Sequence, residues 1–145
     1  LMPDAFLGVD VIVGFPGEGE EEFLETYNLL ESIEASFLHI FPFSERPGTP
    51  AVTMPHKVQS RIATERVERL ESLSKRLYKS FAEKYLGTTR SVLFESTDHS
   101  GQMFGYTDNY LRVTHPYDTK LINTIVNVRL LSLDDEGNIG SEIVG

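Results

Sequence analysis

The sequence contains no cysteine. This absence excludes disulfide bonds within the chain, and it excludes any metal ion or iron–sulfur cluster held by cysteines of the chain. There is also no run of apolar residues of the length that crosses a membrane, and Leu1-Met2-Pro3 is unlike a signal peptide. We therefore expect a cytoplasmic protein that has no membrane partner.

Basic residues are also scarce. Lysine and arginine number 13 against 22 aspartates and glutamates, which gives a formal net charge of -9. The first 55 residues carry one base and ten acids, residues 56–86 carry eight bases and four acids, and residues 87–145 carry four bases and eight acids. Any electrostatic attraction for RNA must centre on the middle segment, unless its bases form only an ordinary solvated helix face.

The N-terminal third is organised around residues 9–23, VDVIVGFPGEGEEEF. The β-branched, almost continuously apolar start is typical of a parallel strand covered on both faces. Gly14 and Gly17 then bracket a sharp turn, and Glu20, Glu21 and Glu22 meet the positive end of a helix dipole. The pattern predicts a strand that turns into a helix at its carboxyl end, where α/β folds bind ligands, although plain βα turns of this kind are common.

A second strand follows this helix. Apolar spacing predicts the helix over residues 20–35, and SFLHIFPFS at residues 36–44 predicts the strand, which completes a βαβ unit. His39 is either a hydrogen-bonded core histidine or a ligand or base. Three prolines predict a loop over residues 45–55. Arg46, the only base in this third, is either a clamp for phosphate or carboxylate or an ion-pair partner.

Residues 56–86 predict one long helix that ends at Gly87. The bases expected on its exposed side are Arg61, Arg66, Arg69, Lys75, Arg76, Lys79 and Lys84. The remaining residues change to strand periodicity, with strands predicted in RSVLFES, GYTDNYLRVTH, LINTIVNVRLLSL and GNIGSEIV. A small closed β-barrel fits this pattern, so we predict two domains, residues 1–87 and 88–145. Its aromatics Phe104, Tyr106 and Tyr110, with Arg112, form either a base-stacking platform or barrel core.

Several short motifs carry a family resemblance. Asp10, Ile12, Gly14, Pro16, Gly17 and Glu18 resemble the D-x-I-x-G-x-P-G-E signature on the fifth barrel strand of radical S-adenosylmethionine (SAM) enzymes, which lies against the adenosine of SAM. ETY at 25–27, LHIFPFS at 38–44, RPGTPA at 46–51 and GYTDNYLRV at 105–113 follow in order. Together they resemble the C-terminal part of the bacterial threonylcarbamoyladenosine tRNA methylthiotransferases, which end in a small RNA-binding barrel called TRAM. Gly19, in place of a usual threonine, and Phe43, in place of a usual tyrosine, depart from the pattern.

The resemblance implies a fold class of α/β plus all-β. The expected parts are the C-terminal βαβ portion of a radical SAM partial TIM barrel, a long linking helix and a small antiparallel TRAM β-barrel. It also implies a longer enzyme that adds a methylthio group to C2 of threonylcarbamoyladenosine next to the anticodon of tRNA. That enzyme uses SAM and two 4Fe-4S clusters, whose cysteine ligands are absent from this chain, so we expect the chain alone to be inactive.

The resemblance further implies site residues. The expected SAM contacts are Ile12, Gly14, Pro16, Gly17, Glu18, His39 and Phe41. The expected RNA contacts are Arg46, Tyr106, Tyr110 and Arg112. No catalytic or metal-binding residue is expected here. Two alternatives stay open, a stand-alone RNA-binding module with vestigial barrel strands and a methylthiotransferase that modifies a ribosomal protein. The isolated chain is expected to self-associate through its barrel strands, because an apolar strand left without a neighbour pairs with a second copy.

Overall fold

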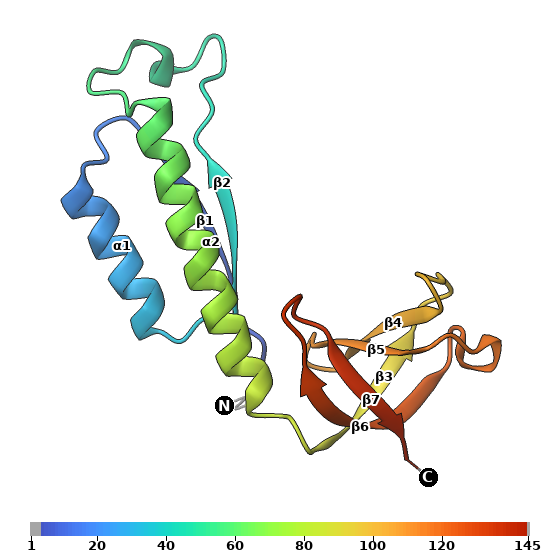
Figure 1. Cartoon of the computed structure of the whole chain (residues 1–145). Coiled ribbons are helices and arrows are strands. Elements are labelled where there is room, and N and C mark those ends of the chain that lie inside the picture. Colours follow the sequence, from blue (N-terminus) through green and yellow to red (C-terminus); the bar gives the residue numbers. More distant parts are fainter. Residues whose placement is uncertain (1–3, 145) are drawn as a thin grey trace. The chain divides into compact units, whose positions relative to one another are not determined.

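The computed structural model describes residues 4–144 (Figure 1). Two compact units are present. Leu7–Tyr78 forms one, and the other comprises the chain from Lys79 onward with the segment that ends at Phe6. Both predicted fold classes are confirmed, since the first unit is α/β and the second is a closed β-barrel. The predicted domain boundary after residue 87 stays a prediction, because compactness alone does not define a folding domain.

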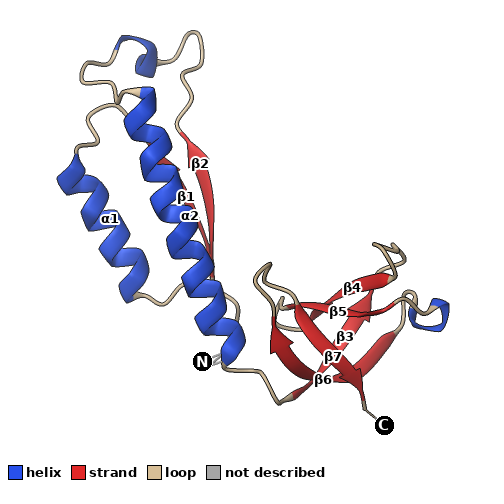
Figure 2. Cartoon of the chain, viewed as in Figure 1, coloured by secondary structure: helices blue, strands red, loops and turns tan. Residues whose placement is uncertain are grey.

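The first unit is a βαβ unit followed by a long helix (Figure 2). In order, its elements are β1 (Gly8–Val13), α1 (Glu20–Ser32), β2 (Phe37–Pro42), a 3-10 turn (Pro50–Thr53) and α2 (Ser60–Glu83). β1 and β2 are parallel, and Val11 lies opposite Ile40. α2 is shorter than the helix predicted over residues 56–86, and the 3-10 turn lies inside the stretch predicted to have no regular structure.

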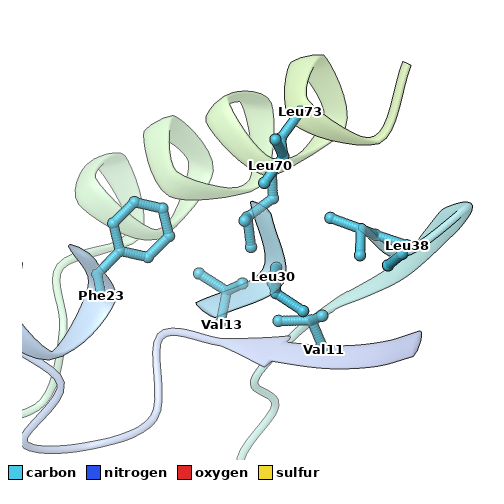
Figure 3. Packing of buried hydrophobic residues seen from close by; sticks show 8 residues of the cluster. Val11, Val13, Phe23, Leu30, Leu38, Leu70 and Leu73 are labelled. Atoms are coloured by element: carbon cyan, nitrogen blue, oxygen red, sulfur yellow. The ribbon is translucent and has the colours of Figure 1, made fainter. Parts of the chain in front are cut away.

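One face of the two-stranded sheet is covered by α1 and α2 (Figure 3). The buried side chains that meet there are Val11, Val13, Phe23, Leu30, Leu38, Leu70 and Leu73. They come from both strands and both helices, so each element depends on the others for its apolar cover. Burial of one such side chain contributes about 1.5–3 kcal/mol, which makes this cluster the main source of stability in the unit.

The opposite face of the sheet is open. Ile12 is 61% exposed and Phe41 is 51% exposed, and both project from the side that carries no helix. The sequence predicted that β1 is covered on both faces, but among the described residues only one face is covered. His39 lies on this face as well and is exposed, so it is not a core histidine; its ring meets the ring of Phe37 edge-on, with centroids 5.0 Å apart.

Several basic side chains of α2 contact side chains of α1. Arg66 is buried, Arg69 Nη1 lies 2.8 Å from a Glu20 carboxylate oxygen, and Arg76 donates to the Tyr27 hydroxyl at 2.8 Å. A further hydrogen bond to Glu31 and the bond to Tyr27 raise the pKa of Arg76 above its ordinary value. The expectation that Arg66 lies on the exposed side of the helix is wrong, because Glu18 and the start of α1 cover it, whereas Arg76 is exposed as expected.

The turn after β1 is fixed by a buried ion pair between Arg66 and Glu18. One Glu18 carboxylate oxygen accepts from the N–H of Gly14 and from Nη1 of Arg66, each at 2.9 Å, and Nη1 also donates to the Glu18 carbonyl at 2.8 Å. Gly14 has a φ of +88°, and a Cβ there would lie 3.2 Å from the Cβ of Ala63. The turn therefore joins β1, α1 and α2 at one point, and Gly14 is required both for its backbone conformation and for its closeness to α2.

The second unit is a five-stranded closed barrel. Its strands are β3 (Thr89–Phe94), β4 (Gln102–Thr107), β5 (Arg112–Pro116), β6 (Ile125–Leu133) and β7 (Ile139–Ile143). They close in the order β3-β4-β5-β7-β6, and the pairings are antiparallel except for β5 with β7. A short 3-10 turn, Thr119–Leu121, precedes β6. Closure leaves the ladder without free edges, which is how small β domains avoid pairing with other chains.

The segment GYTDNYLRVTH forms a hairpin, so the single strand predicted there is wrong. β4 ends at Thr107, and β5 begins at Arg112. The buried Thr107 hydroxyl donates to the Asn109 side chain at 2.6 Å and accepts from the N–H of Leu111 at 2.9 Å. These bonds hold Tyr110 at a φ of +64°, a left-handed conformation that is uncommon for an aromatic residue.

We predict that Arg66→Met lowers the free energy of unfolding of the first unit by about 3 kcal/mol, because it leaves the Glu18 carboxylate without its buried partner. Arg69→Met is the matched control. Its ion pair with Glu20 is more exposed, so its loss is expected to cost less than about 1 kcal/mol. Denaturation followed by far-ultraviolet circular dichroism reports mainly on α1 and α2. Equal effects of the two substitutions would contradict this assignment.

We also predict that the isolated chain self-associates through the open sheet face, since exposed apolar side chains on an uncovered strand pair invite a second copy. Light scattering should give a mass that rises with concentration. The double variant Ile12→Thr, Phe41→Thr should remain monomeric, whereas Leu29→Gln, at an exposed leucine of α1, should associate like the wild type. A monomeric wild-type chain at all concentrations would refute the prediction.

Candidate functional site

Three of the expected SAM contacts lie together on the open sheet face. Ile12 of β1 is the direct neighbour of Phe41 of β2, and His39 follows one step along the same face, opposite Asp10. The three side chains come from adjacent parallel strands, so the pairing register decides their contact. They provide two apolar surfaces and one imidazole, which suits a flat, nitrogen-containing ring such as adenine.

The other expected SAM contacts lie in the turn after β1. The Glu18 carboxylate is engaged by Gly14 and Arg66, Pro16 is buried, and the N–H of Gly17 donates to the carbonyl of His56 at 2.8 Å. Gly14 faces Ala63 of α2. These residues shape the end of β1, and their direct contact with a cofactor stays a prediction.

A second loop lies at the same end of the sheet. Phe43 follows β2, and its ring packs edge-on against Phe15 of the first turn, with centroids 5.0 Å apart. Arg46 is exposed on this loop, and its neighbour Glu45 forms an ion pair with Lys57 at 2.8 Å. Arg46 follows the carboxyl end of β2, the end of a parallel strand at which α/β folds bind ligands, and its contact with an anionic group stays a prediction.

A hollow of about 360 Å³ runs along β2 and α2. It is lined by Phe37, Leu38, His39, Ile40, Phe41, Glu71, Ser74 and Lys75. Of the three α2 residues, the sequence interpretation selected only Lys75, as one of the exposed bases of the helix and not as part of this hollow. Ser74 is buried, and its hydroxyl accepts the N–H of Leu38 at 2.9 Å, so it covers part of the outer edge of β2. The sequence signal for Ser74 was its position on the apolar side of the predicted helix, where a polar side chain needs a hydrogen-bond partner.

No metal centre is present in the part of the chain that the structure describes. No group of three or more histidine, aspartate or glutamate side chains is placed to hold an ion there, and the sequence has no cysteine. An iron–sulfur cluster does not fit these residues, because thiolates are its usual ligands. Within residues 4–144, moreover, no helix has the length and apolar character needed to cross a membrane.

Two of the expected RNA contacts lie side by side on the outer surface of the barrel. Tyr106 of β4 is the direct neighbour of Arg112 of β5. The guanidinium group of Arg112 lies over the ring of Phe104, 4.1 Å from its centroid, and His99 meets the same ring edge-on at 5.1 Å. Phe104 is half-buried and faces outward, so it supports the arginine and is not part of the barrel core. This arrangement offers a planar cation beside an exposed phenol ring.

The third expected RNA contact in the barrel unit, Tyr110, lies at the tip of the β4–β5 hairpin. It is 67% exposed, and its ring contacts Phe6 with centroids 6.0 Å apart. The same N-terminal segment is bound through Asp4, which accepts from Arg90 at 2.7 Å and from the Tyr85 hydroxyl at 3.2 Å. The bond from Arg90 lowers the pKa of Asp4, and burial raises the pKa of Tyr85. Tyr110 is therefore presented by a different element from Tyr106 and Arg112.

Comparison with known proteins shows which proteins this chain is similar to. Residues 83–136 match the TRAM domain. The chain is 42% identical to a threonylcarbamoyladenosine tRNA methylthiotransferase of Bacillus subtilis over 90% of this chain and 30% of the relative. It is 36% identical to the enzyme of the same name from Thermotoga maritima over 94% of this chain and 31% of the relative. A tRNA-2-methylthio-N(6)-dimethylallyladenosine synthase of Symbiobacterium thermophilum is 39% identical over 90% and 28%.

The chain thus spans about a third of the length of the curated relatives it matches. The family resemblance that the short motifs indicated is confirmed. The chain contains a TRAM domain and is a homologue of the C-terminal part of the tRNA methylthiotransferases.

Proposed function

We propose that this chain is the C-terminal part of a radical SAM enzyme that adds a methylthio group to C2 of threonylcarbamoyladenosine next to the anticodon of tRNA. The observation that carries the proposal is the identity of 42% with a threonylcarbamoyladenosine tRNA methylthiotransferase over 90% of the chain. The open face with Ile12, His39 and Phe41, and the outer surface of the barrel, supply two separate candidate surfaces for SAM and for tRNA.

The proposal that the substrate is threonylcarbamoyladenosine, and not another modified adenosine, rests on two short motifs. A relative named for threonylcarbamoyladenosine is 42% identical to this chain, and one named for dimethylallyladenosine is 39% identical, so overall identity does not decide between the two substrates. L-H-x-F-P at residues 38–42 and GYTDNY at residues 105–110 resemble the threonylcarbamoyl branch most. These motifs lie on β2 and on the β4–β5 hairpin, and they include residues of the two candidate surfaces, such as His39 and Tyr106, beside core residues such as Leu38.

The residues of this chain would bind and orient, and the cofactors would supply the reactivity. SAM and the iron–sulfur clusters would supply the radical chemistry that is needed at an unactivated carbon. Ile12 and Phe41 would exclude water from one side of the adenine, and His39 would offer a hydrogen-bonding ring nitrogen on the same face. Arg46 would meet an anionic group of SAM or of the tRNA.

Two alternative functions are distinguishable. A stand-alone RNA-binding module would bind tRNA but not SAM, even in the full-length protein. A methylthiotransferase for a ribosomal protein would bind SAM and modify an aspartate instead of an adenosine. Mass spectrometry of tRNA and of ribosomal proteins from a strain that lacks the gene would separate these alternatives from the proposed function, since only one class of molecule would lose its methylthio group.

We predict that Ile12→Ala weakens SAM binding to the full-length enzyme about tenfold, because a ligand that covers an isoleucine gains roughly 1–2 kcal/mol from it. Leu29→Ala, at an equally exposed aliphatic residue of α1, is the control and should bind SAM normally. Gly14→Val is unsuitable, since its side chain would strike Ala63 whether or not SAM binds there. Equilibrium dialysis measures the affinity. An unchanged value for Ile12→Ala would remove the open face from the SAM site.

We predict that Tyr110→Asn weakens tRNA binding about tenfold and leaves the barrel almost as stable as in the wild-type chain. Stacking on an aromatic ring contributes about 1–3 kcal/mol per base. Asparagine tolerates the positive φ better than tyrosine, by about 1 kcal/mol, which offsets the loss of the ring contact with Phe6. Fluorescence anisotropy and thermal unfolding test the two parts. A large loss of stability without a loss of affinity would make Tyr110 a structural residue.

A further inference from the structure

A continuous row of side chains crosses four strands on the outer surface of the barrel. Arg112 of β5 lies opposite Tyr106 of β4, Tyr106 lies opposite Leu93 of β3, and Leu93 lies opposite Ile125 of β6. Neighbouring strands are about 4.8 Å apart, so the row is about 14 Å long. We call these four residues the cross-strand row. Sequence interpretation selected only Arg112 and Tyr106, because the other two become their neighbours only through strand pairing.

The cross-strand row faces away from the core. The next residues along two of the strands, Val92 and Val113, are fully buried, and alternation places the row on the opposite side. Leu93 is 50% exposed and Ile125 is 69% exposed, and they lie beside Tyr106, which is 43% exposed. Adjacent exposed aliphatic and aromatic side chains on one sheet face are typical of a binding surface.

The chemistry of the row favours unpaired bases. The guanidinium group of Arg112 lies over the ring of Phe104, and this planar group and the Tyr106 ring both offer surfaces on which bases can stack. Leu93 and Ile125 extend this surface with apolar area and contain no charged group. Double-stranded RNA presents mainly phosphates and 2′-hydroxyls, which need several cations, and the row holds one. Residues 87–145 carry eight acids against four bases, so phosphate attraction cannot supply most of the affinity.

We propose that the cross-strand row binds unpaired bases of RNA, chiefly by stacking on Arg112 and Tyr106 and by apolar contact with Leu93 and Ile125. The inference rests on the proposed function, in which the barrel binds tRNA. It adds that the cross-strand row is the surface that binds, and that this surface prefers unpaired bases to duplex RNA. It also sets the salt dependence. With one or two phosphates neutralised, the slope of log K against log salt for a single strand is about -0.7 to -1.4.

The test uses the whole chain and two fluorescent probes, a short unstructured RNA and a blunt RNA duplex of the same length. Anisotropy should show tighter binding of the unstructured probe, with the shallow salt slope given above. The double variant Leu93→Thr, Ile125→Thr should weaken that binding about tenfold. Threonine is β-branched and is favoured in strands, so folding should be retained.

Two further variants complete the test. Leu131→Thr, at an exposed leucine of β6 outside the row, is the matched control and should bind like the wild type. Arg112→Lys keeps the charge but loses the planar group, so it should weaken binding about fivefold with an unchanged salt slope. If the double variant melts early, Arg112→Lys decides the question, because it removes no apolar contact with the core.

The outcomes separate the two proposals. No binding of any RNA by the wild-type chain would overturn both the proposed RNA role and the row. Binding that the double variant and Arg112→Lys leave unchanged would overturn the row alone, because RNA would then bind another surface of the chain. Equal losses in Leu131→Thr and in the double variant, or tighter binding of the duplex, would also overturn it.

Discussion

The buried ion pair between Arg66 and Glu18 determines how the first unit is assembled. The Glu18 carboxylate also accepts the N–H of Gly14, so one interaction joins the end of β1, the start of α1 and the middle of α2. A buried charge is strongly unfavourable without its partner. The pair therefore forms only when all three elements are in place, and it fixes the direction in which β1 presents its carboxyl end.

The same packing explains why the candidate SAM surface is open. α1 is acidic and α2 is basic, and contacts such as Arg69 with Glu20 bring both helices to one face of the sheet. The other face keeps Ile12 and Phe41 exposed and carries little charge. In the barrel, closure leaves no free strand edge, so the available binding surface is the outer side of the strands. Both candidate surfaces are thus faces that the packing of their own unit does not use.

Much of the fold could be predicted because its signals are local. β1, α1 and β2 follow from periodicity and from the turn at Gly14, and the barrel strands follow from alternation. The β4–β5 hairpin was missed because its loop, from Asp108 to Leu111, contains no glycine or proline. The turn depends on hydrogen bonds of the buried Thr107 and Asn109, which no local pattern reveals.

The sequence by itself determined most of the secondary structure, the family resemblance and a set of candidate residues, since propensity, periodicity and motifs depend on residues that are close in the chain. Only the tertiary structure decided that Arg66 is buried, that Glu18 is bound to it, and that Leu93 and Ile125 adjoin Tyr106. Burial is set by what packs against a helix, and strand register is set by pairing between distant segments, so neither is written in the spacing of neighbouring residues.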